Sequence, residues 1–582
     1  MTLPSDTTLA LIRWLASRDT AQLHTLIRHR DIPLQACESF RSLAQALLEP
    51  DTIQATLQTL PRAELLALNT LEAADTARLT ALSERGLVSL DGDAPDLLIP
   101  RSSLDLLADI DTATGEPPAP TPVELSERDL AAASSVALTL VIAVSDCLDV
   151  LSHTPLGVNA EGSLTAVSLK TLQTLLESGY DVSSAVDLAR LAGLIGSNRQ
   201  LAALTPSGWS WMNLPDHERY AHLVHSWWEA MPTWLRQVTI EHPGSPWDSQ
   251  FSNMASYHYP LAPTQPVLSE SRTQALSLGL LSNAGPTPWM HALATSGDVA
   301  QKYERWMPAA APGVFAHDDF TLLATGPLSP THRDILSRLA SLELGGLVPR
   351  YRLTASSVLT ALQDGLSANE MHAMLAEVCV NDSPASMRAL IDDVSRRALE
   401  IEVHPRSDNT RIITTREGLS EELLSDPSLI VLGLARAGQD ELSCSWPAER
   451  VHSTLIAASY SNLLMSVDGG PQVPSLLVAE KGHHDDTDDR DALLTALVEG
   501  ARDLAAKGIP AGLTSIIEVA TETKTPLEIE VRMPDESLVT VVMEPRALSA
   551  GRLRGVELKH AVEKTLPVSH ITSIRAWEGQ EA

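Results

Sequence analysis

The sequence has few cysteines and no long apolar run. Its four cysteines are widely spaced among 582 residues without a CxxC pair, so neither a disulfide framework nor a zinc site is predicted. The N-terminus has no basic stretch followed by an apolar core and a cleavage site, so we expect no secretory signal peptide. The longest apolar run, 136–144, is about half a membrane span and predicts a buried helix. We therefore expect a cytoplasmic protein, with nucleoid association as an alternative, and no membrane contact.

Positive charge is also scarce. Lys and Arg number 42 against 74 Asp and Glu, and the formal net charge is −32. This balance disfavours indiscriminate phosphate binding, so any contact with DNA must come from a local cationic patch. The charge needs no partner as its explanation, because it also keeps a protein soluble through self-repulsion.

Motifs for catalysis are absent from the sequence. A helicase motor needs a phosphate-binding loop of the GxxxxGK[ST] type, and none occurs. There is also no GxSxG, HExxH or Cys-His signature, so we predict no enzyme and no cofactor. The isolated His153, His225 and His317 are expected at the surface or in the core.

An acidic, histidine-containing run begins at position 483. Its members could bind a divalent metal, but adjacent ligands on a flexible stretch lack a preformed geometry. Carboxylates also suit the start of a helix. We therefore predict a linker and an acidic helix N-terminus, and no metal site, for His483, His484, Asp485, Asp486, Asp488 and Asp489.

The periodic segments predict an α+β, mainly α protein of several domains. Helices follow one another up to Gly86, and two short apolar stretches around an acidic turn then complete a pattern typical of a winged helix-turn-helix. The Pro-rich segment 111–122 predicts a linker. A second winged-helix-like unit follows, and 237–310 predicts a connecting helical segment with long loops. Five tryptophans are expected in the core: Trp209, Trp211, Trp227, Trp228 and Trp234. The alternative is that their indole rings stack on nucleic-acid bases.

A change of pattern begins near position 320. A strand, a helix and a strand are predicted at 320–325, 331–341 and 347–353, followed by two helices broken at Gly365. A third helix and a hairpin over 399–415 then complete another winged helix. We expect four domains, at 1–122, 123–310, 311–475 and 476–582.

The third helix of this unit, 386–397, has one apolar side and one charged side. Its apolar residues recur at i, i+3, i+4 and i+7, so that side is predicted to be buried. On the other side, Asp392 and Asp393 each precede an arginine by four residues, so their charges are mutually satisfied and a solvated structural face is favoured over a DNA-reading one. The hairpin is basic. If DNA binds here, the hairpin would contact the phosphate backbone of the DNA, and the helix would contribute little to sequence recognition.

Two family resemblances together cover most of the chain. The stretches "DDFTLLATGPLSPTHRDILSRLASLELGG", "YRLTASSVLTALQDGLSANEMHAMLAEVC" and "SPASMRALIDDVSRR" resemble actinobacterial helicase-associated proteins that carry a domain like the N-terminal region of XPB-type helicases. The tail, 527–577, is similar to WYL-type domains, which implies a small Sm-like β-barrel associated with nucleic-acid or nucleotide sensing. At the Trp-Tyr-Leu signature this chain has "GRLRGVEL", without either aromatic, and His570 occupies a position where an Arg is common.

The resemblance implies an accessory protein without a motor, acting in DNA repair or transcription. We expect weak contact with DNA and stronger contact with a helicase or another protein of DNA transactions. The predicted nucleic-acid-binding residues are Arg406, Arg411 and Arg416 on the third wing, Arg552, Arg554 and Lys559 on the tail, and Arg388, Arg396 and Arg397 on the helix. The alternatives are a WYL-type nucleotide-sensing transcriptional regulator and a purely protein-binding acidic scaffold.

Overall fold

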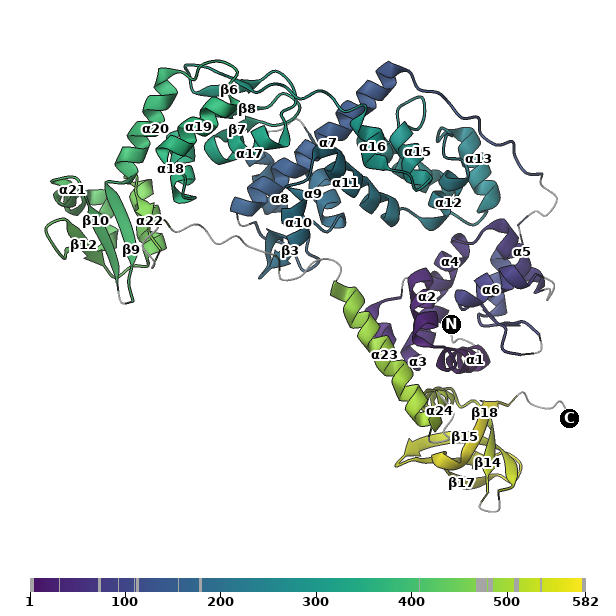
Figure 1. Cartoon of the computed structure of the whole chain (residues 1–582). Coiled ribbons are helices and arrows are strands. Elements are labelled where there is room, and N and C mark those ends of the chain that lie inside the picture. Colours follow the sequence, from purple (N-terminus) through teal and green to yellow (C-terminus); the bar gives the residue numbers. More distant parts are fainter. Residues whose placement is uncertain are drawn as a thin grey trace. The chain divides into compact units, whose positions relative to one another are not determined.

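The computed structural model describes residues 5–30, 32–71, 75–92, 94–108, 110, 115–154, 156–176, 180–407, 409–466, 471, 479, 485–506, 512–533 and 536–577. Its elements fall into two compact units (Figure 1). Unit 1 comprises Met1–Val123, Met231–Arg272 and His484–Ala582, and unit 2 comprises Glu124–Ala230 and Thr273–His483. The fold is α+β and mainly helical, with several small sheets, as the sequence predicted.

Unit 1 joins both ends of the chain. Its N-terminal elements are α1 (Ser5–Ala16), α2 (Thr20–Arg30), α3 (Phe40–Leu48), α4 (Pro50–Gln58), α5 (Arg62–Thr70), α6 (Thr76–Glu84) and the short antiparallel pair β1 (Val88–Ser89) and β2 (Asp96–Leu97). Its middle elements are α12 (Thr233–Glu241), α13 (Ser249–His258) and the start of α14 (Thr264–Ser277). Its C-terminal elements are α23 (Asp485–Ala506), α24 (Leu513–Thr523), β14 (Leu527–Arg532), β15 (Leu538–Ser549), β16 (Arg552–Glu557), β17 (Val562–Pro567) and β18 (Ile571–Ala576).

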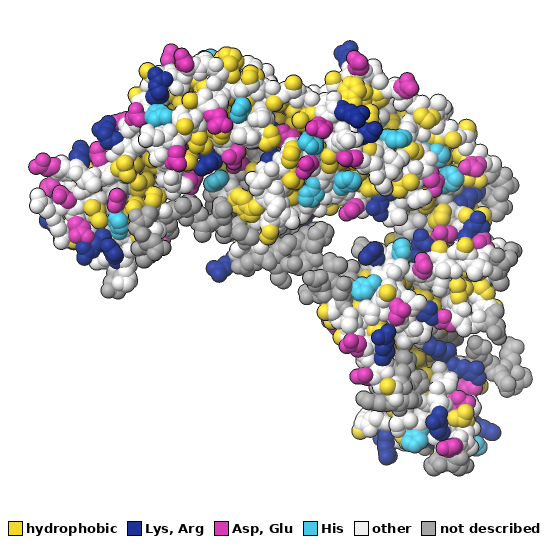
Figure 2. All heavy atoms as spheres, viewed as in Figure 1, with side chains coloured by type: hydrophobic (Ala, Val, Ile, Leu, Met, Phe, Trp, Pro, Cys, Tyr) yellow, Lys and Arg dark blue, Asp and Glu magenta, His cyan; other side chains and the backbone are white. Residues whose placement is uncertain are grey.

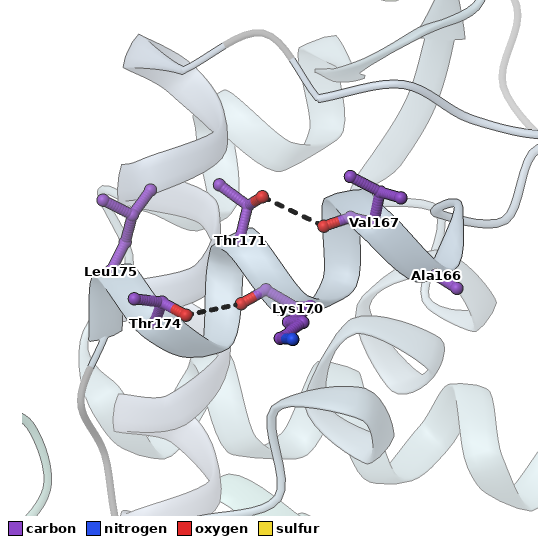
Figure 3. Close-up of a pocket in the computed structure, with 6 residues that line it drawn as sticks. All are labelled: Ala166, Val167, Lys170, Thr171, Thr174 and Leu175. Atoms are coloured by element: carbon purple, nitrogen blue, oxygen red, sulfur yellow. Dashed lines mark hydrogen bonds between the residues drawn. The ribbon is translucent and has the colours of Figure 1, made fainter.

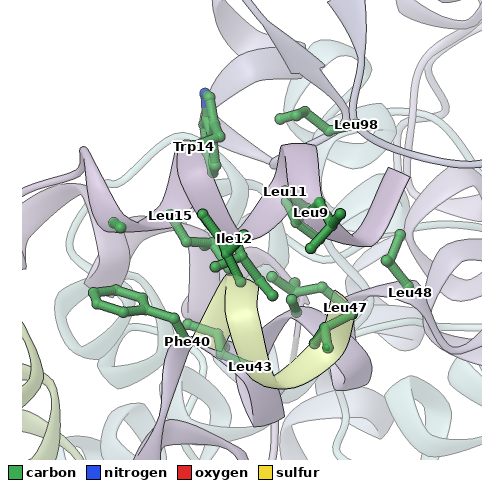
Figure 4. Close-up of a cluster of buried hydrophobic side chains, with 14 of the residues drawn as sticks. Leu9, Leu11, Ile12, Trp14, Leu15, Phe40, Leu43, Leu47, Leu48 and Leu98 are labelled. Carbon is green, nitrogen blue, oxygen red and sulfur yellow. The ribbon is translucent and has the colours of Figure 1, made fainter. Parts of the chain in front are cut away.

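One hydrophobic core contains residues from the two ends of the chain. Figure 4 shows buried side chains of α1 and α3 around Ile12, with a yellow-green helix from the C-terminal region between the purple helices. Gly512 has a positive φ of 74°, and a Cβ there would lie 3.0 Å from the Cβ of Ala16, so α24 begins in close contact with α1. The Arg13 guanidinium also donates a hydrogen bond of 2.7 Å to the carbonyl oxygen of Ile574 in β18. The predicted segments 1–122 and 476–582 thus contribute to one compact unit.

The tail strands form a five-stranded antiparallel sheet in the order β17-β16-β15-β14-β18. Five short strands agree with the sequence pattern. The sheet is not closed among the described residues, since β17 and β18 are its two edges and do not pair with each other, and the predicted small WYL-like barrel stays a prediction. Closure depends on which strands pair, and alternation along each strand carries no information on that choice.

The helical part of unit 2 is built on one long apolar helix, α7 (Glu127–His153). It is the one described helix that is long and apolar enough to cross a membrane, and 61% of its most apolar window is buried. The predicted buried helix at 136–144 therefore lies in a core, as expected. Around it lie α8 (Ala166–Leu176), α9 (Val182–Leu191), β3 (Ile195–Asn198), β4 (Leu201–Leu204), α10 (Pro206–Trp211), α11 (Asp216–Ala230), α15 (Pro288–Ala294) and α16 (Val299–Glu304).

The tryptophans of this region are mostly in the interior. Trp209 is half-buried. The other four predicted core tryptophans are buried: Trp211, Trp227 and Trp228 in unit 2 and Trp234 in unit 1. The segment 237–310, predicted as helices with long loops, contains helices joined by shorter connections.

The remaining part of unit 2 contains two sheets. The first, in the order β5-β6-β8-β7, consists of β5 (Val314–Ala316), β6 (Thr321–Ala324), β8 (Arg350–Arg352) and β7 (Ser341–Leu344). Its core residues pack with those of α17 (Pro330–Leu339), α18 (Ala355–Gln363), α19 (Ala368–Val378) and α20 (Ala385–Ala398). The second, in the order β11-β12-β10-β9-β13, consists of β11 (Ala435–Arg436), β12 (Glu441–Cys444), β10 (Thr410–Thr414), β9 (Ile401–Pro405) and β13 (Leu463–Leu464). Beside the second sheet lie α21 (Leu419–Ser425), a 3-10 helix (Pro427–Leu432) and α22 (Ala448–Ala457).

Candidate functional site

The third predicted helix of the 311–475 region is α20, and its apolar side is buried as the spacing predicts. Met387 and Ile391 are fully buried and Val394 is nearly so, all in the core shared with α17, α18 and α19. Leu390 is half-buried at the margin of that core. The opposite side of α20 is therefore the face that solvent or a ligand can reach.

The charges on the open face of α20 are largely neutralised. Asp393 forms ion pairs with Arg396 and with Arg397, the latter at 2.9 Å. Asp392 lies 2.8 Å from the Nε2 atom of His372 on α19, and not against Arg396 as the spacing alone suggested. The Arg388 guanidinium donates hydrogen bonds to the backbone and side-chain oxygens of Ser383. The His372 contact had no signal in the sequence, because it depends on how α19 packs beside α20.

The predicted hairpin is present as β9 and β10, but it is not a free wing. β10 pairs with β9 on one side and β12 on the other, and β9 pairs in parallel with β13. Ile401, Val403 and Ile412 point into a core that includes residues of α21 and α22. The hairpin is thus the centre of a sheet, and most of its backbone is unavailable to a ligand.

The basic residues of the hairpin are spread along it, and most are paired. Arg411 forms an ion pair with Glu441 on β12. Arg416 lies 3.2 Å from a Glu400 oxygen and 2.8 Å from a Glu422 oxygen. Strands β9 and β10 are about 17 Å long, and Arg406 lies at the end opposite to Arg416. Arg406 has no ion pair with another described residue. Phosphate contact by this group of arginines would first have to break existing pairs.

His404, the remaining basic group of the hairpin, lies 2.8 Å from a carboxylate oxygen of Glu402 on the same strand. The predicted hairpin position Asp408 lies outside the described residues. His404 therefore adds a further local carboxylate pair and not a free cation.

The tail cations lie in unit 1, on or beside β16. Leu553 of β16 is buried, and Arg552 and Arg554 on either side of it are exposed, so both arginines face away from the core. Arg554 is 3.9 Å from Glu563, a weak contact between exposed groups. Arg552 and Lys559 are exposed and have no ion pair with another described residue. These two side chains are the more available part of the predicted tail patch.

The neighbouring basic residues of the tail hold a buried carboxylate. Glu557 accepts hydrogen bonds from Lys564 at 2.7 Å and from His560 at 3.0 Å, and these bonds hold the pKa of Glu557 below its ordinary value. Lys564 and His560 are therefore occupied within the protein. Of the basic cluster, only the outward-facing residues remain for a ligand.

The nine predicted cations are divided between the two units. Those of α20 and the hairpin belong to unit 2, and those of the tail belong to unit 1. Basic and acidic side chains are interspersed on the face shown in Figure 2. A patch with a net positive field, which strong phosphate binding needs, is not built from the predicted residues of α20 and the hairpin.

A buried ionic cluster, which the sequence did not indicate, joins α11 to α17. Asp216 forms an ion pair with Arg333 and lies 3.7 Å from Arg219, and all three side chains are less than 10% exposed. Burial lowers the pKa of Arg219 to about 10. Because Asp216 and Arg333 are 117 positions apart, no local pattern links them.

A second buried acid lies near this cluster. The Asp146 carboxylate accepts a hydrogen bond of 2.6 Å from the Tyr180 hydroxyl. Burial raises the pKa of Asp146 to about 7. A Cβ at Gly345, in the connection from β7 to β8, would lie within 3 Å of both side chains, so this connection packs tightly against the helical part of unit 2.

A hollow of about 650 Å³ lies along the exposed side of α8 (Figure 3). Its lining residues are Ala166, Val167, Lys170, Thr171, Thr174 and Leu175. The Thr171 and Thr174 hydroxyls donate to the carbonyl oxygens of Val167 and Lys170, so they are tied back to the helix. The lining contains no acid, histidine or thiol, and Lys170 is its one ionisable side chain.

The described residues contain no group of three or more His, Cys, Asp or Glu side chains that could hold a metal. Of the acidic run considered in the sequence, His483 and His484 lie outside the described residues. The aspartates that follow fall at the start of α23, where their side chains are likewise not described. The prediction of an acidic helix start agrees with the position of α23.

Comparison with known proteins adds one finding. No curated protein matches the chain. Residues 314–438 match the family described as "Helicase conserved C-terminal domain". This segment runs from β5 through α20 and the β9–β10 hairpin and lies within the predicted domain 311–475. The chain thus contains a helicase C-terminal-like domain, which supports a helicase-associated protein with a helicase-related function.

Proposed function

We propose that the protein is a helicase-associated accessory protein without a motor of its own, which binds a helicase or another protein of DNA repair or transcription and contacts DNA weakly. In this proposal the segment 311–475, which contains the matched residues 314–438, is an XPB-N-like domain that includes a winged helix, formed by α18, α19, α20 and the β9–β10 hairpin. The protein carries out no catalytic step itself. The helicase-related match over this segment supports the association with DNA transactions.

The observation that carries the proposal is the pairing of the cations on α20 and the hairpin. Arg396, Arg397, Arg411 and Arg416 each form an ion pair with a carboxylate. Affinity for nucleic acid comes from releasing counterions when free cations neutralise phosphates, so paired cations contribute little of it. A module of this kind is better suited to contact with protein, with DNA held by a few remaining cations.

The DNA part of the proposal is tested by fluorescence anisotropy with duplex, single-stranded and forked DNA over a range of salt concentrations. Four predicted cations lack a described carboxylate partner: Arg388, Arg406, Arg552 and Lys559. At about 0.9 per neutralised phosphate, the slope of log K against log salt should be no steeper than about −4. Triple alanine variants of the hairpin (406, 411, 416) and of the tail (552, 554, 559) would assign the contact, and Lys170→Ala on α8 is the control. A slope of about −6 or steeper would contradict weak binding.

The partner is tested by cross-linking the tagged full-length chain in its native cells and identifying the enriched proteins. We expect a nucleic-acid-dependent ATPase among them, because an accessory protein needs a motor to act upon. Most of the cross-links between this chain and the ATPase should come from residues 314–438. Recovery of partners with no role in DNA transactions would contradict the proposal.

A purely protein-binding acidic scaffold is the second candidate. The formal net charge of −32 and the paired cations both favour it. A scaffold would show no DNA binding even at low salt, whereas the accessory protein would show weak, salt-sensitive binding. Thermal stabilisation by added nucleotide would instead favour a WYL-type sensor, because a ligand that binds the folded state raises its stability.

A further inference from the structure

The sheet β5-β6-β8-β7 has one face in a core and one face that is not covered by its own helices. Val314 and Ala316 of β5, Leu322 of β6 and Tyr351 of β8 are at most 5% exposed and pack with α17–α20. The residues between them in each strand point to the other face. An antiparallel sheet with one open face usually carries polar residues there.

The open face of this sheet carries a row of apolar side chains instead. Phe315 is opposite Leu323, and Leu323 is opposite Arg350. Leu344 on β7 is also opposite Arg350. Residues opposite each other in paired strands share a face, so these side chains lie side by side across the sheet.

The row continues beyond β5. The backbone of Cys379 pairs in parallel with that of Val314, whose side chain is in the core. The next residue on each segment points to the other face, so Val380 lies on the open face beside Phe315. The apolar row is therefore Val380, Phe315, Leu323 and Leu344, and its members are 37% to 46% exposed. Adjacent exposed apolar side chains mark a contact surface more often than a solvated one.

We propose that the apolar row binds an acidic amphipathic helix of a protein partner. This inference rests on the proposed function, because it names the surface through which the segment 314–438 would contact its partner. Five extended segments about 4.8 Å apart make the row about 19 Å long, which corresponds to about 13 residues of α-helix. Three turns of helix with apolar residues at i, i+3 or i+4, and i+7 fit that length.

The charges beside the row select an acidic partner. Arg350 lies within the row, and Arg352 lies next to it on the same strand and the same face. Both arginines contact one carboxylate, Glu343, at 3.0 Å from Arg350, and Asp319 also helps to raise the pKa of Arg352. Arg350, the arginine within the row, has a side chain that is 47% exposed and so can be reached by a carboxylate of a partner. A carboxylate on the partner helix would complete this pairing, whereas a basic helix would be repelled.

A second copy of this chain is a poorer occupant for the row. A symmetric contact between two copies would bring the Arg350 groups of both toward one apolar interface, where the two cations would repel one another. Nucleic acid is also excluded as the main ligand of the row, since four apolar side chains offer no donors to phosphate. The occupant is thus a segment of another protein.

The test uses the purified full-length chain and a fluorescein-labelled synthetic peptide. The peptide is a 13-residue amphipathic helix with a leucine face flanked by glutamates. A second peptide replaces each glutamate with lysine, and a third replaces the leucines with serine. Fluorescence anisotropy should show saturable binding of the glutamate peptide, and at least tenfold weaker binding of the other two.

Four variants of the chain, one of them a control, locate the contact. Leu323→Glu should weaken binding of the glutamate peptide at least tenfold, and Arg350→Glu should reduce its preference over the lysine peptide. Ile430→Glu, at a side chain 74% exposed in the 3-10 helix 427–432, is the matched control and should bind as the unaltered chain does. Leu323→Thr, which keeps a strand-forming residue, should give an intermediate loss even if Leu323→Glu disturbs the sheet.

Several results would overturn the inference. Equal binding of the glutamate and lysine peptides, or unchanged binding to Leu323→Glu, would remove the apolar row as the site. Self-association in sedimentation velocity that Leu323→Glu abolishes would make the row an interface between copies. These outcomes do not depend on which partner protein the cells contain. If the peptide binds but cross-linking captures no ATPase, only the proposed function is refuted. If cross-linking captures an ATPase but the peptide does not bind, only the docking surface is refuted.

Discussion

Replacing Asp216 with asparagine should destabilise unit 2 more than any change on its surface. The carboxylate lies between two buried guanidinium groups, those of Arg333 on α17 and Arg219 on α11. Arg219 also donates a hydrogen bond of 3.1 Å to Ser145, and Arg333 donates one of 3.1 Å to the Leu328 carbonyl oxygen. Asparagine keeps the size of the side chain but removes its negative charge. Among the described residues of this cluster, Asp216 is the carboxylate that pairs with both arginines.

The expected cost follows from leaving two cations buried without a counter-charge. Removing one partner of a buried ion pair typically costs about 3–5 kcal/mol. Since a difference of about 1.4 kcal/mol is a factor of ten in an equilibrium constant, local opening should become roughly 10²- to 4 × 10³-fold more frequent. The loss should be concentrated where α11 and α17 meet.

Hydrogen exchange followed by mass spectrometry measures this opening, because a chain of several domains does not give one unfolding free energy. Peptides from α11 and α17 should exchange faster in Asp216→Asn, while peptides from α1 and α24 in unit 1 serve as the internal control. Arg333→Met combined with Asp216→Asn should recover part of the loss, since one uncompensated charge is then removed. A change of less than about 1 kcal/mol in both helices would refute the reasoning.

Three further predictions concern other buried contacts. Gly345→Ala should destabilise unit 2 by about 1–3 kcal/mol in a thermal-shift assay, because the added Cβ would lie 2.8 Å from the Tyr180 hydroxyl oxygen. Gly326→Ala is the control, since a Cβ there would lie 3.8 Å from the nearest atom. Asp146 has an ordinary pKa of 3.8 and a folded pKa of about 7, so between these values the folded state holds a proton that the unfolded state has lost. The stability of unit 2 should therefore fall as pH rises through this window, by up to ~1.4 kcal/mol per unit, and Asp146→Asn should remove this component in denaturant titrations at pH 5 and 7.5. Ile12→Ala should cost about 2–5 kcal/mol and raise hydrogen exchange in α24 as well as α1, whereas exchange confined to α1 would contradict a shared core.

Local patterns were sufficient for most individual elements. The helix at α20 was predicted from the spacing of Met387, Ile391 and Val394, and the β9–β10 hairpin from alternation around a turn. Such signals succeed because a helix or a hairpin is decided by residues a few positions apart. β5 and β7, the two edge strands of the sheet β5-β6-β8-β7, were not predicted from the sequence.

The candidate site was less predictable than the elements that carry it. The Asp393–Arg397 pair was expected from the spacing of four, but the partner of Asp392 is His372, on the neighbouring helix. Whether Arg411 is free depends on Glu441, which lies on a strand 30 positions later. Net charge and local spacing indicate how many cations exist, but not which carboxylates reach them.

The sequence by itself determined the element types, the mainly helical α+β class, the scarcity of positive charge and the absence of the motifs that a motor needs. Only the tertiary structure decided that α24 shares a core with α1, that the tail sheet stays open, and that an apolar row faces outward from the β5–β8 sheet. Hydrophobic attraction is non-directional, so apolar residues specify that a face is buried without naming the segment that covers it. Strand partners and ion pairs between distant positions therefore follow from the way the whole chain packs.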